Sequence, residues 1–117
     1  NFMKKSSIIF LSHILENIEN IEEFTKGVLK DIFLKDKEKQ YAVTRGVEII
    51  GEAVKNLSLS FREKHSLVKW SKITGTRDKL IHQYFGVDVK LLWDIVKDEL
   101  PILKKQIQDI LEAEKKE

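Results

Sequence analysis

The segment from Asp36 to Leu57 reads DKEKQYAVTRGVEIIGEAVKNL, and it decides the fold class of this chain. Its apolar residues recur at alternating intervals of four and three, which places them on one face of a helix. Asp36 stands where an N-cap side chain accepts a hydrogen bond from the first turn. The pattern predicts a long amphipathic helix whose buried face comprises Val43, Val47, Ile50, Val54 and Leu57.

A second amphipathic helix is predicted before this segment, from about Ser6 to Phe24. Gly27 follows it, and glycine commonly ends a helix because it adopts a left-handed conformation without strain. The apolar piece from Val28 to Leu34 predicts one or two further helical turns. The expected packing residues of the first helix are Leu11, Ile14, Leu15, Ile18, Ile21 and Phe24.

Two more helices are predicted after the segment from Asp36 to Leu57. The polar stretch from Ser58 to Val68 is expected to be a connecting loop, and a helix from about Trp70 to Phe85 follows. Gly86 is the expected end of that helix, and Asp88 the expected N-cap of the next. The packing residues of these two helices are expected to be Ile73, Leu80, Ile81, Tyr84, Leu92, Val96, Leu100, Leu103, Ile107 and Ile110.

Pro101 lies inside the last of these helices. A proline there removes a backbone hydrogen bond at a cost of ~3 kcal/mol, so a kink or a break is expected near Leu100. The charged tail from Glu112 to Glu117 is expected to fray. Nothing in the chain alternates with period two, so no sheet is predicted. Residues 1–117 are therefore predicted to form one all-α domain, an up-and-down four-helix bundle with an extra short helix.

The composition excludes several classes of protein. The chain has no cysteine, so disulfides and thiolate metal sites are excluded. No apolar run approaches the roughly 20 residues that span a bilayer. The interrupted apolar run near the N-terminus is unlike a signal peptide, so we expect a cytoplasmic protein.

Charge is distributed unevenly although the formal net charge is only +2. Four acids and no base occur from Glu16 to Glu23, whereas bases dominate from Arg62 to Lys79. Such a stretch is either a solvated helix face or a phosphate-binding surface. The candidate RNA phosphate-binding residues are Arg62, Lys69, Lys72 and Lys79.

The basic stretch leads into RDKLIHQY, from Arg77 to Tyr84. In a helix, Asp78 and His82 share one face, and so do Arg77 and Tyr84. Arg77 and His82 lie about 140° apart around the helix, so their pairing is possible without being dictated by spacing. A lone histidine on a helix more often packs or faces solvent, and Arg77 and Asp78 could equally be ordinary surface charges.

These residue types nevertheless suit RNA cleavage without a metal. Histidine titrates near neutrality and serves as a general base or acid. Arginine binds phosphate oxygens through two parallel hydrogen bonds from its planar guanidinium group. His82 would take the proton of a 2′-hydroxyl, and Arg77 would stabilise the charge that develops at phosphorus. The products would be a 2′,3′-cyclic phosphate and a 5′-hydroxyl. No cofactor is expected, and no histidine–carboxylate cluster beyond Asp78 and His82 has metal-ligand spacing.

One copy of the motif supplies one histidine, whereas the reaction needs both a base and an acid. His13 lies among apolar residues of the first helix, and His65 lies in the predicted basic loop. A two-fold dimer would bring two copies of His82 and Arg77 to one cleft. We therefore expect a homodimer with a composite site.

Glu52 is a further candidate, because it lies between apolar Ile50 and Val54 and so is expected to be partly buried. A buried carboxylate needs a partner, and Arg77 is one candidate. Such a pair would position the guanidinium. Two alternatives to this pair stay equally open: Glu52 is exposed to solvent, or it forms a structural ion pair with another residue.

The motif Arg77-Asp78-x-x-x-His82-x-Tyr84 resembles the signature of the HEPN superfamily, and Tyr84 is similar to the added tyrosine of its HepT-like branch. Further stretches fit the same layout, with Asp78 standing where many relatives have asparagine. They are Ile50-Gly51-Glu52-Ala53, Trp70, Ile73, Gly75, Thr76, Phe85, and Trp93 to Pro101.

The resemblance implies a HEPN-like helical bundle that dimerises with both motifs at the interface. It implies a metal-independent endoribonuclease, the toxin of a toxin–antitoxin pair, with Arg77 and His82 catalytic and Asp78 supporting. Its partner would be a minimal nucleotidyltransferase antitoxin that transfers AMP to Tyr84. Two alternatives stay open: a non-catalytic nucleotide-binding partner of such a transferase, in which Arg77 and Lys79 hold a phosphate, and a purely structural dimerising bundle.

Overall fold

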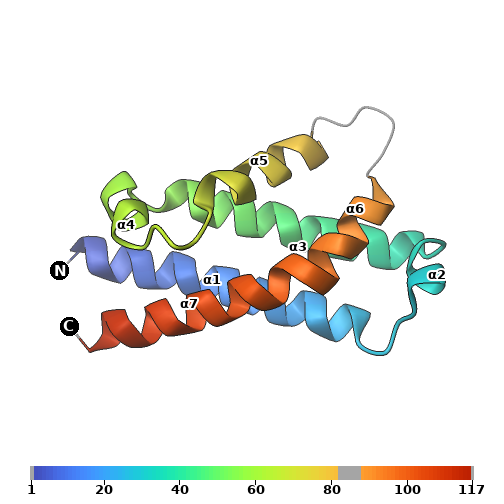
Figure 1. Cartoon of the computed structure of the whole chain (residues 1–117), viewed down its shortest axis with the longest axis horizontal. Coiled ribbons are helices and arrows are strands. Elements are labelled where there is room, and N and C mark those ends of the chain that lie inside the picture. The colour runs from blue at the N-terminus through green and yellow to red at the C-terminus, as the bar shows by residue number, and fades with distance from the viewer. Residues whose placement is uncertain (1, 82–87, 117) are drawn as a thin grey trace.

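The computed structural model describes residues 2–81 and 88–116, and every regular element in these ranges is helical (Figure 1). This confirms the all-α prediction. None of the described helices is long and apolar enough to cross a membrane. The elements are α1 (Phe2–Thr25), α2 (Lys30–Phe33), α3 (Lys37–Asn56), α4 (Leu59–Lys64), α5 (Trp70–Ile81), α6 (Val89–Asp94), the π-helical turn η1 (Ile95–Glu99) and α7 (Leu100–Lys115).

The helices form an elongated body of 46 × 30 × 20 Å. The α1 helix packs along both α3 and α7, and the two described ends of the chain lie at the same end of the body (Figure 1). The α5 helix packs mainly along α3. An apolar groove therefore remains between α5 and α7, with α3 as its floor.

The core follows the predicted helical faces closely. The four predicted residues of α3 and its C-cap residue Leu57 are buried, as are the six predicted from α6 through α7. On α1, Leu15 is only partly buried, and Phe24 is exposed while the next residue, Thr25, is buried. The Thr25 hydroxyl donates to the Ile21 carbonyl at 2.8 Å, which satisfies its polar group inside the core.

The predicted caps and one predicted stop are present. The carboxylates of Asp36 and Asp88 accept from the backbone N–H of Lys39 and Leu91, at 3.1 and 3.0 Å. Gly27 has φ of +71°, the left-handed conformation that ends α1. The expected stop at Gly86 lies outside the described residues.

The stretch expected to be a loop, residues 58–68, contains the short helix α4. Ser58 caps it by accepting from the Phe61 backbone N–H at 3.1 Å, and Phe61 is buried. The indole N–H of Trp70 then donates to the carbonyl oxygens of Arg62 and His65. These contacts join the end of α4 to the start of α5, so the loop prediction was wrong for residues 59–64.

The irregularity expected from Pro101 takes the form of a π-helical turn immediately before it, at Ile95–Glu99. Proline cannot donate to the carbonyl four residues earlier, and a π-turn changes which carbonyls need partners. The wider turn also returns Leu100 to the face that carries Leu92 and Val96. The helix therefore continues without a break into α7.

The end of α7 is more ordered than its charged sequence indicated. The helix extends to Lys115, and Glu114 is only 4% exposed. One Glu114 carboxylate oxygen accepts from His65 Nε2 at 2.9 Å and lies 3.0 Å from Lys64 Nζ. The tail was expected to fray from Glu112, but it is helical through Lys115. Lys64 at the end of α4 and the next residue, His65, supply the partners of Glu114, which the sequence pattern did not indicate.

Candidate functional site

The arginine of the motif lies directly over a glycine of α3. A Cβ built on Gly51 would come within 2.5 Å of Cγ and 3.2 Å of Cδ of Arg77. Only a residue without a side chain leaves room for the arginine stem there. The contact fixes where α5 crosses α3 and thereby where the Arg77 guanidinium emerges.

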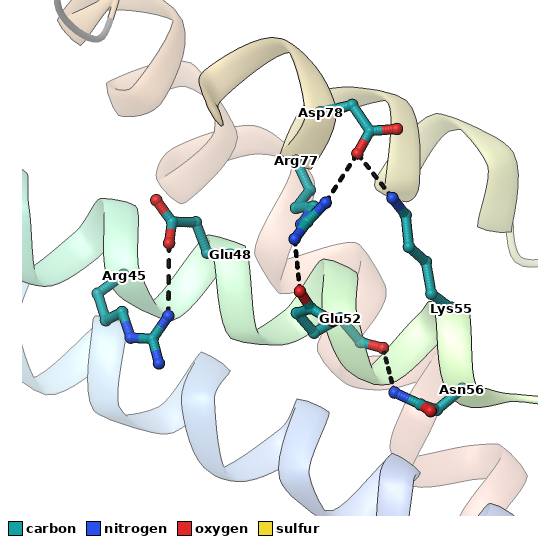
Figure 2. A network of polar contacts seen from close by, with 7 residues as sticks. All are labelled: Arg45, Glu48, Glu52, Lys55, Asn56, Arg77 and Asp78. Atoms are coloured by element: carbon teal, nitrogen blue, oxygen red, sulfur yellow. Dashed lines mark hydrogen bonds and ion pairs between the residues drawn. The ribbon is translucent and has the colours of Figure 1, made fainter. Parts of the chain in front are cut away.

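Four charged side chains form a connected cluster at this crossing (Figure 2). Arg77 pairs through Nη2 with Glu52 of α3 and through Nη1 with Asp78, the latter at 3.0 Å. Lys55, also of α3, lies 2.8 Å from the same Oδ1 atom of Asp78. We call these four residues the Arg77 cluster. The expected Arg77–Glu52 pair is therefore present in the geometry.

The exposure of the cluster differs from the expectation in one respect. Glu52 was expected to be partly buried, but its side chain is 53% exposed, whereas that of Arg77 is only 19% exposed. It is thus the arginine that is embedded. Its Nε atom is buried with no hydrogen-bond partner among the described residues.

The pairing perturbs the protonation of both central residues. The hydrogen bond to Asp78 raises the pKa of Arg77 above its ordinary value, and Glu52 adds to this effect. The hydrogen bond from Lys55 lowers the pKa of Asp78, with a further contribution from Arg77. Both shifts favour the charged forms, so the pairing stabilises Arg77 as a cation and Asp78 as a carboxylate.

Lys55 is the member that the sequence did not reveal. It follows Glu52 by three residues and so shares its side of α3, which was the available signal. Its partner, however, lies on another helix 23 residues away. The pairing depends on how α5 crosses α3, and the spacing of charges along the chain does not specify that.

Two central residues of the predicted site, His82 and Tyr84, lie outside the described residues. The described portion of the motif, Arg77 to Ile81, is helical as expected. The Asp78 carboxylate was expected to support the motif on the same helix face as His82. In the described residues it accepts hydrogen bonds from Arg77 and Lys55.

The predicted phosphate-binding residues fall into two groups. Lys69 and Lys79 are exposed, and no described carboxylate pairs with either of them. Lys72, by contrast, pairs with Glu99 at 2.7 Å, and the Nε atom of Arg62 is buried. The structure thus leaves Lys69 and Lys79 as the more available cations.

An apolar cavity of about 280 Å³ occupies the groove between α5 and α7. Leu67 and Ile102 belong to its lining, and they are 89% and 62% exposed. The Lys72–Glu99 pair joins α5 to η1 at the same groove. Among the described residues, no group of three histidine, aspartate or glutamate side chains could hold a metal ion.

Comparison with known proteins gives a consistent result. A family model described as Ribonuclease HepT-like matches residues 14–110. The chain is 50% identical over 106 residues to “Putative RNase TTE0752” of Caldanaerobacter subterraneus subsp. tengcongensis, covering 91% of this chain and 95% of that protein. It is 47% identical over 108 residues to “Probable ribonuclease HepT” of Thermococcus cleftensis, covering 92% and 98%.

A third relative is longer than this chain. “Gamma-glutamylcyclotransferase and putative RNase MJ0434” of Methanocaldococcus jannaschii is 50% identical over 110 residues, which are 94% of this chain and 50% of that protein. No solved structure matches the chain.

Proposed function

The chain belongs to the HepT-like ribonuclease family, and from that premise we propose that it is a metal-independent endoribonuclease, the toxin of a toxin–antitoxin pair. The observation that carries this proposal is the embedded Arg77. Its stem is fixed over Gly51, and two carboxylates orient its guanidinium. A pre-oriented arginine stabilises developing phosphate charge better than a mobile one.

The proposed reaction is an intramolecular displacement within the RNA chain. His82 removes the proton of a 2′-hydroxyl, and the 2′-oxygen forms a bond to the adjacent phosphorus. The bond between phosphorus and the 5′-oxygen breaks, and that oxygen is protonated by a second histidine. Arg77 donates to the non-bridging oxygens while negative charge accumulates on them.

The second histidine is the His82 of another copy of the chain, so the active form is a homodimer. The histidine count supports this proposal, since each chain contributes one motif histidine. The exposed apolar rim of the groove beside α5, at Leu67 and Ile102, is a further feature that favours association. A monomeric variant with full cleavage activity would contradict the composite site.

Regulation would come from a minimal nucleotidyltransferase antitoxin. The Tyr84 oxygen attacks the α-phosphorus of ATP, pyrophosphate leaves, and the hydroxyl proton is released. The attached AMP places negative charge and bulk two residues from His82, where it excludes RNA. Incubation with such a partner and ATP would add the mass of AMP to the intact protein, and Tyr84→Phe would prevent it.

The decisive test is RNA cleavage in the presence of EDTA. We expect Arg77→Ala and His82→Ala each to lower the rate about 100-fold or more, with the dimer intact. Arg45→Ala is a matched control, because Arg45 is an exposed arginine of α3 paired only with Glu48 among the described residues. Wild-type protein that binds ATP or AMP but never cleaves RNA would support the nucleotide-binding alternative instead.

A further inference from the structure

Lys55 enters the Arg77 cluster through a single atom. Its Nζ and the Nη1 of Arg77 share one carboxylate oxygen, Oδ1 of Asp78, at 2.8 and 3.0 Å (Figure 2). Asp78 follows Arg77 on α5, whereas Lys55 comes from α3. Lys55 on α3 therefore fixes the Asp78 carboxylate, and that carboxylate in turn accepts a hydrogen bond from Arg77.

The hydrogen-bond donors of Arg77 that the cluster does not use are the ones left to bind a substrate. A guanidinium has five N–H groups, of which the Nε–H is buried here. Glu52 and Asp78 each accept from one terminal nitrogen, so each of these nitrogens keeps one further N–H. Those two N–H groups are the ones available to a phosphate, provided that the guanidinium keeps this orientation.

Charge is the second consideration. Lys55 and Arg77 balance Glu52 and Asp78, so the cluster carries no net charge. Without Lys55 the cluster would carry one net negative charge beside the available N–H groups, and it would repel a phosphate. Asp78 would also lose one of its two fixed partners and could turn toward solvent.

We propose that Lys55 is a positioning residue for RNA binding, which neutralises and immobilises Asp78 so that Arg77 presents its free N–H groups to a phosphate. This inference rests on the proposed ribonuclease function and extends it to a residue outside the motif. Lys55 does not touch the substrate; it acts through Asp78. Its contribution to stability is small, because both partners are substantially exposed.

The test compares Lys55→Met with Lys55→Arg in cleavage of a short RNA oligonucleotide at low salt. We expect Lys55→Met to raise KM about tenfold with kcat within about twofold, and Lys55→Arg to stay near wild type. Lys37→Met, which removes an exposed lysine from the start of α3, is the control for net charge.

A double variant separates electrostatics from simple loss of an ion pair. Lys55→Met with Asp78→Asn restores a neutral cluster, since Glu52 then balances Arg77. We expect its KM to lie well below that of Lys55→Met alone. If Lys55 only joined α3 to α5, the double variant would show no such recovery. A KM of the double variant as high as that of Lys55→Met would therefore overturn the proposal. An unchanged KM in Lys55→Met would overturn it as well.

An independent readout keeps this inference apart from the proposed reaction. Titration of the Asp78 carboxyl by carbon NMR should show its pKa rising in Lys55→Met, because the hydrogen bond from Lys55 is what lowers it most. If wild type cleaves no RNA, the proposed function fails, and equilibrium affinity for the same oligonucleotide replaces KM. Unchanged affinity in Lys55→Met would then reject the inference.

Discussion

Gly51 lies where the stem of Arg77 rests on α3, and this contact positions the whole Arg77 cluster. Glu52 and Lys55 follow on the same helix, so the crossing of α5 brings both within reach of the motif. A displacement of α5 here would move the guanidinium away from Glu52. One backbone contact thus determines the geometry of four charged groups.

Gly51→Ala should therefore reduce both stability and cleavage. The added Cβ meets Arg77 carbons at distances that real atoms do not adopt, so we expect a loss of about 1–3 kcal/mol in the free energy of unfolding. Cleavage should fall further than the folded fraction does, because Arg77 is displaced. Urea unfolding and RNA cleavage on the same samples measure the two effects.

Gly75→Ala is the matched control on the partner helix. No described atom lies within 4 Å of a Cβ at Gly75, so this change should stabilise the protein by up to about 1 kcal/mol through helix propensity. Equal stabilisation by both alanines would contradict a close contact at Gly51.

At the scale of single residues, the sequence predicted which apolar residues are buried better than it predicted which charged residues pair. It named Arg77 as one candidate partner of Glu52, and the two residues do pair, but it expected the glutamate to be partly buried whereas its side chain is 53% exposed. The apolar neighbours Ile50 and Val54 face the core, while Glu52 points off that face. Lys55 was missed because its role depends on the crossing of two helices, which no local pattern encodes.

At the scale of elements, long helices were predicted well and short ones were not. Ser58, Phe61 and Trp70 form a cap, a buried anchor and a hydrogen-bonded junction within a stretch that looks polar and interrupted. A helix as short as α4 offers too few periods for an apolar stripe to stand out. The tertiary contacts of α4, rather than its periodicity, stabilise it.

Glu114 joins α7 to this short helix, and its removal should loosen the junction. Near pH 7 we expect Glu114→Gln to lower the free energy of unfolding by about 1–3 kcal/mol, because the pairs of a buried carboxylate with Lys64 and His65 disappear. Urea unfolding of both proteins measures the difference.

The pH dependence of that difference follows from the shifted pKa. Burial alone would raise the pKa of Glu114, but Lys64 and His65 lower it below its ordinary 4.5. The stabilisation is therefore fully present above pH 4.5 and declines as the pH falls through the lower folded value. Asp109→Asn, an exposed partner of Lys105 on the same helix, should change stability little at any pH. A difference that grows in acid would refute this account.

At the scale of the whole molecule, the basic stretch of the sequence does not form one free surface. Lys64, Lys72 and Arg77 are each paired with carboxylates from other helices. Composition along the chain could not foresee this, since those carboxylates lie far away in sequence. Lys69 and Lys79 remain exposed, and they are the cations that, together with the outward N–H groups of Arg77, we expect to contact RNA phosphates.

This division predicts how RNA affinity responds to salt. For single-stranded RNA, removing one lysine–phosphate pair lowers the salt slope of log affinity by about 0.7. Lys69→Ala and Lys79→Ala should each reduce the slope by that amount, and Lys72→Ala by less, because Glu99 already neutralises Lys72. Lys35→Ala, which changes an exposed lysine between α2 and α3, should leave the slope as it is in wild type.

Fluorescence anisotropy of a labelled oligonucleotide, with His82 changed to alanine to prevent cleavage, gives these slopes. The comparison isolates phosphate pairing from the chemistry, because every variant then carries the same inactive motif. Equal slopes in the His82→Ala parent and in both lysine variants made on it, Lys69→Ala and Lys79→Ala, would exclude the two lysines from RNA binding. The phosphate-binding surface would then have to lie away from the exposed cations of α5 and the segment that precedes it.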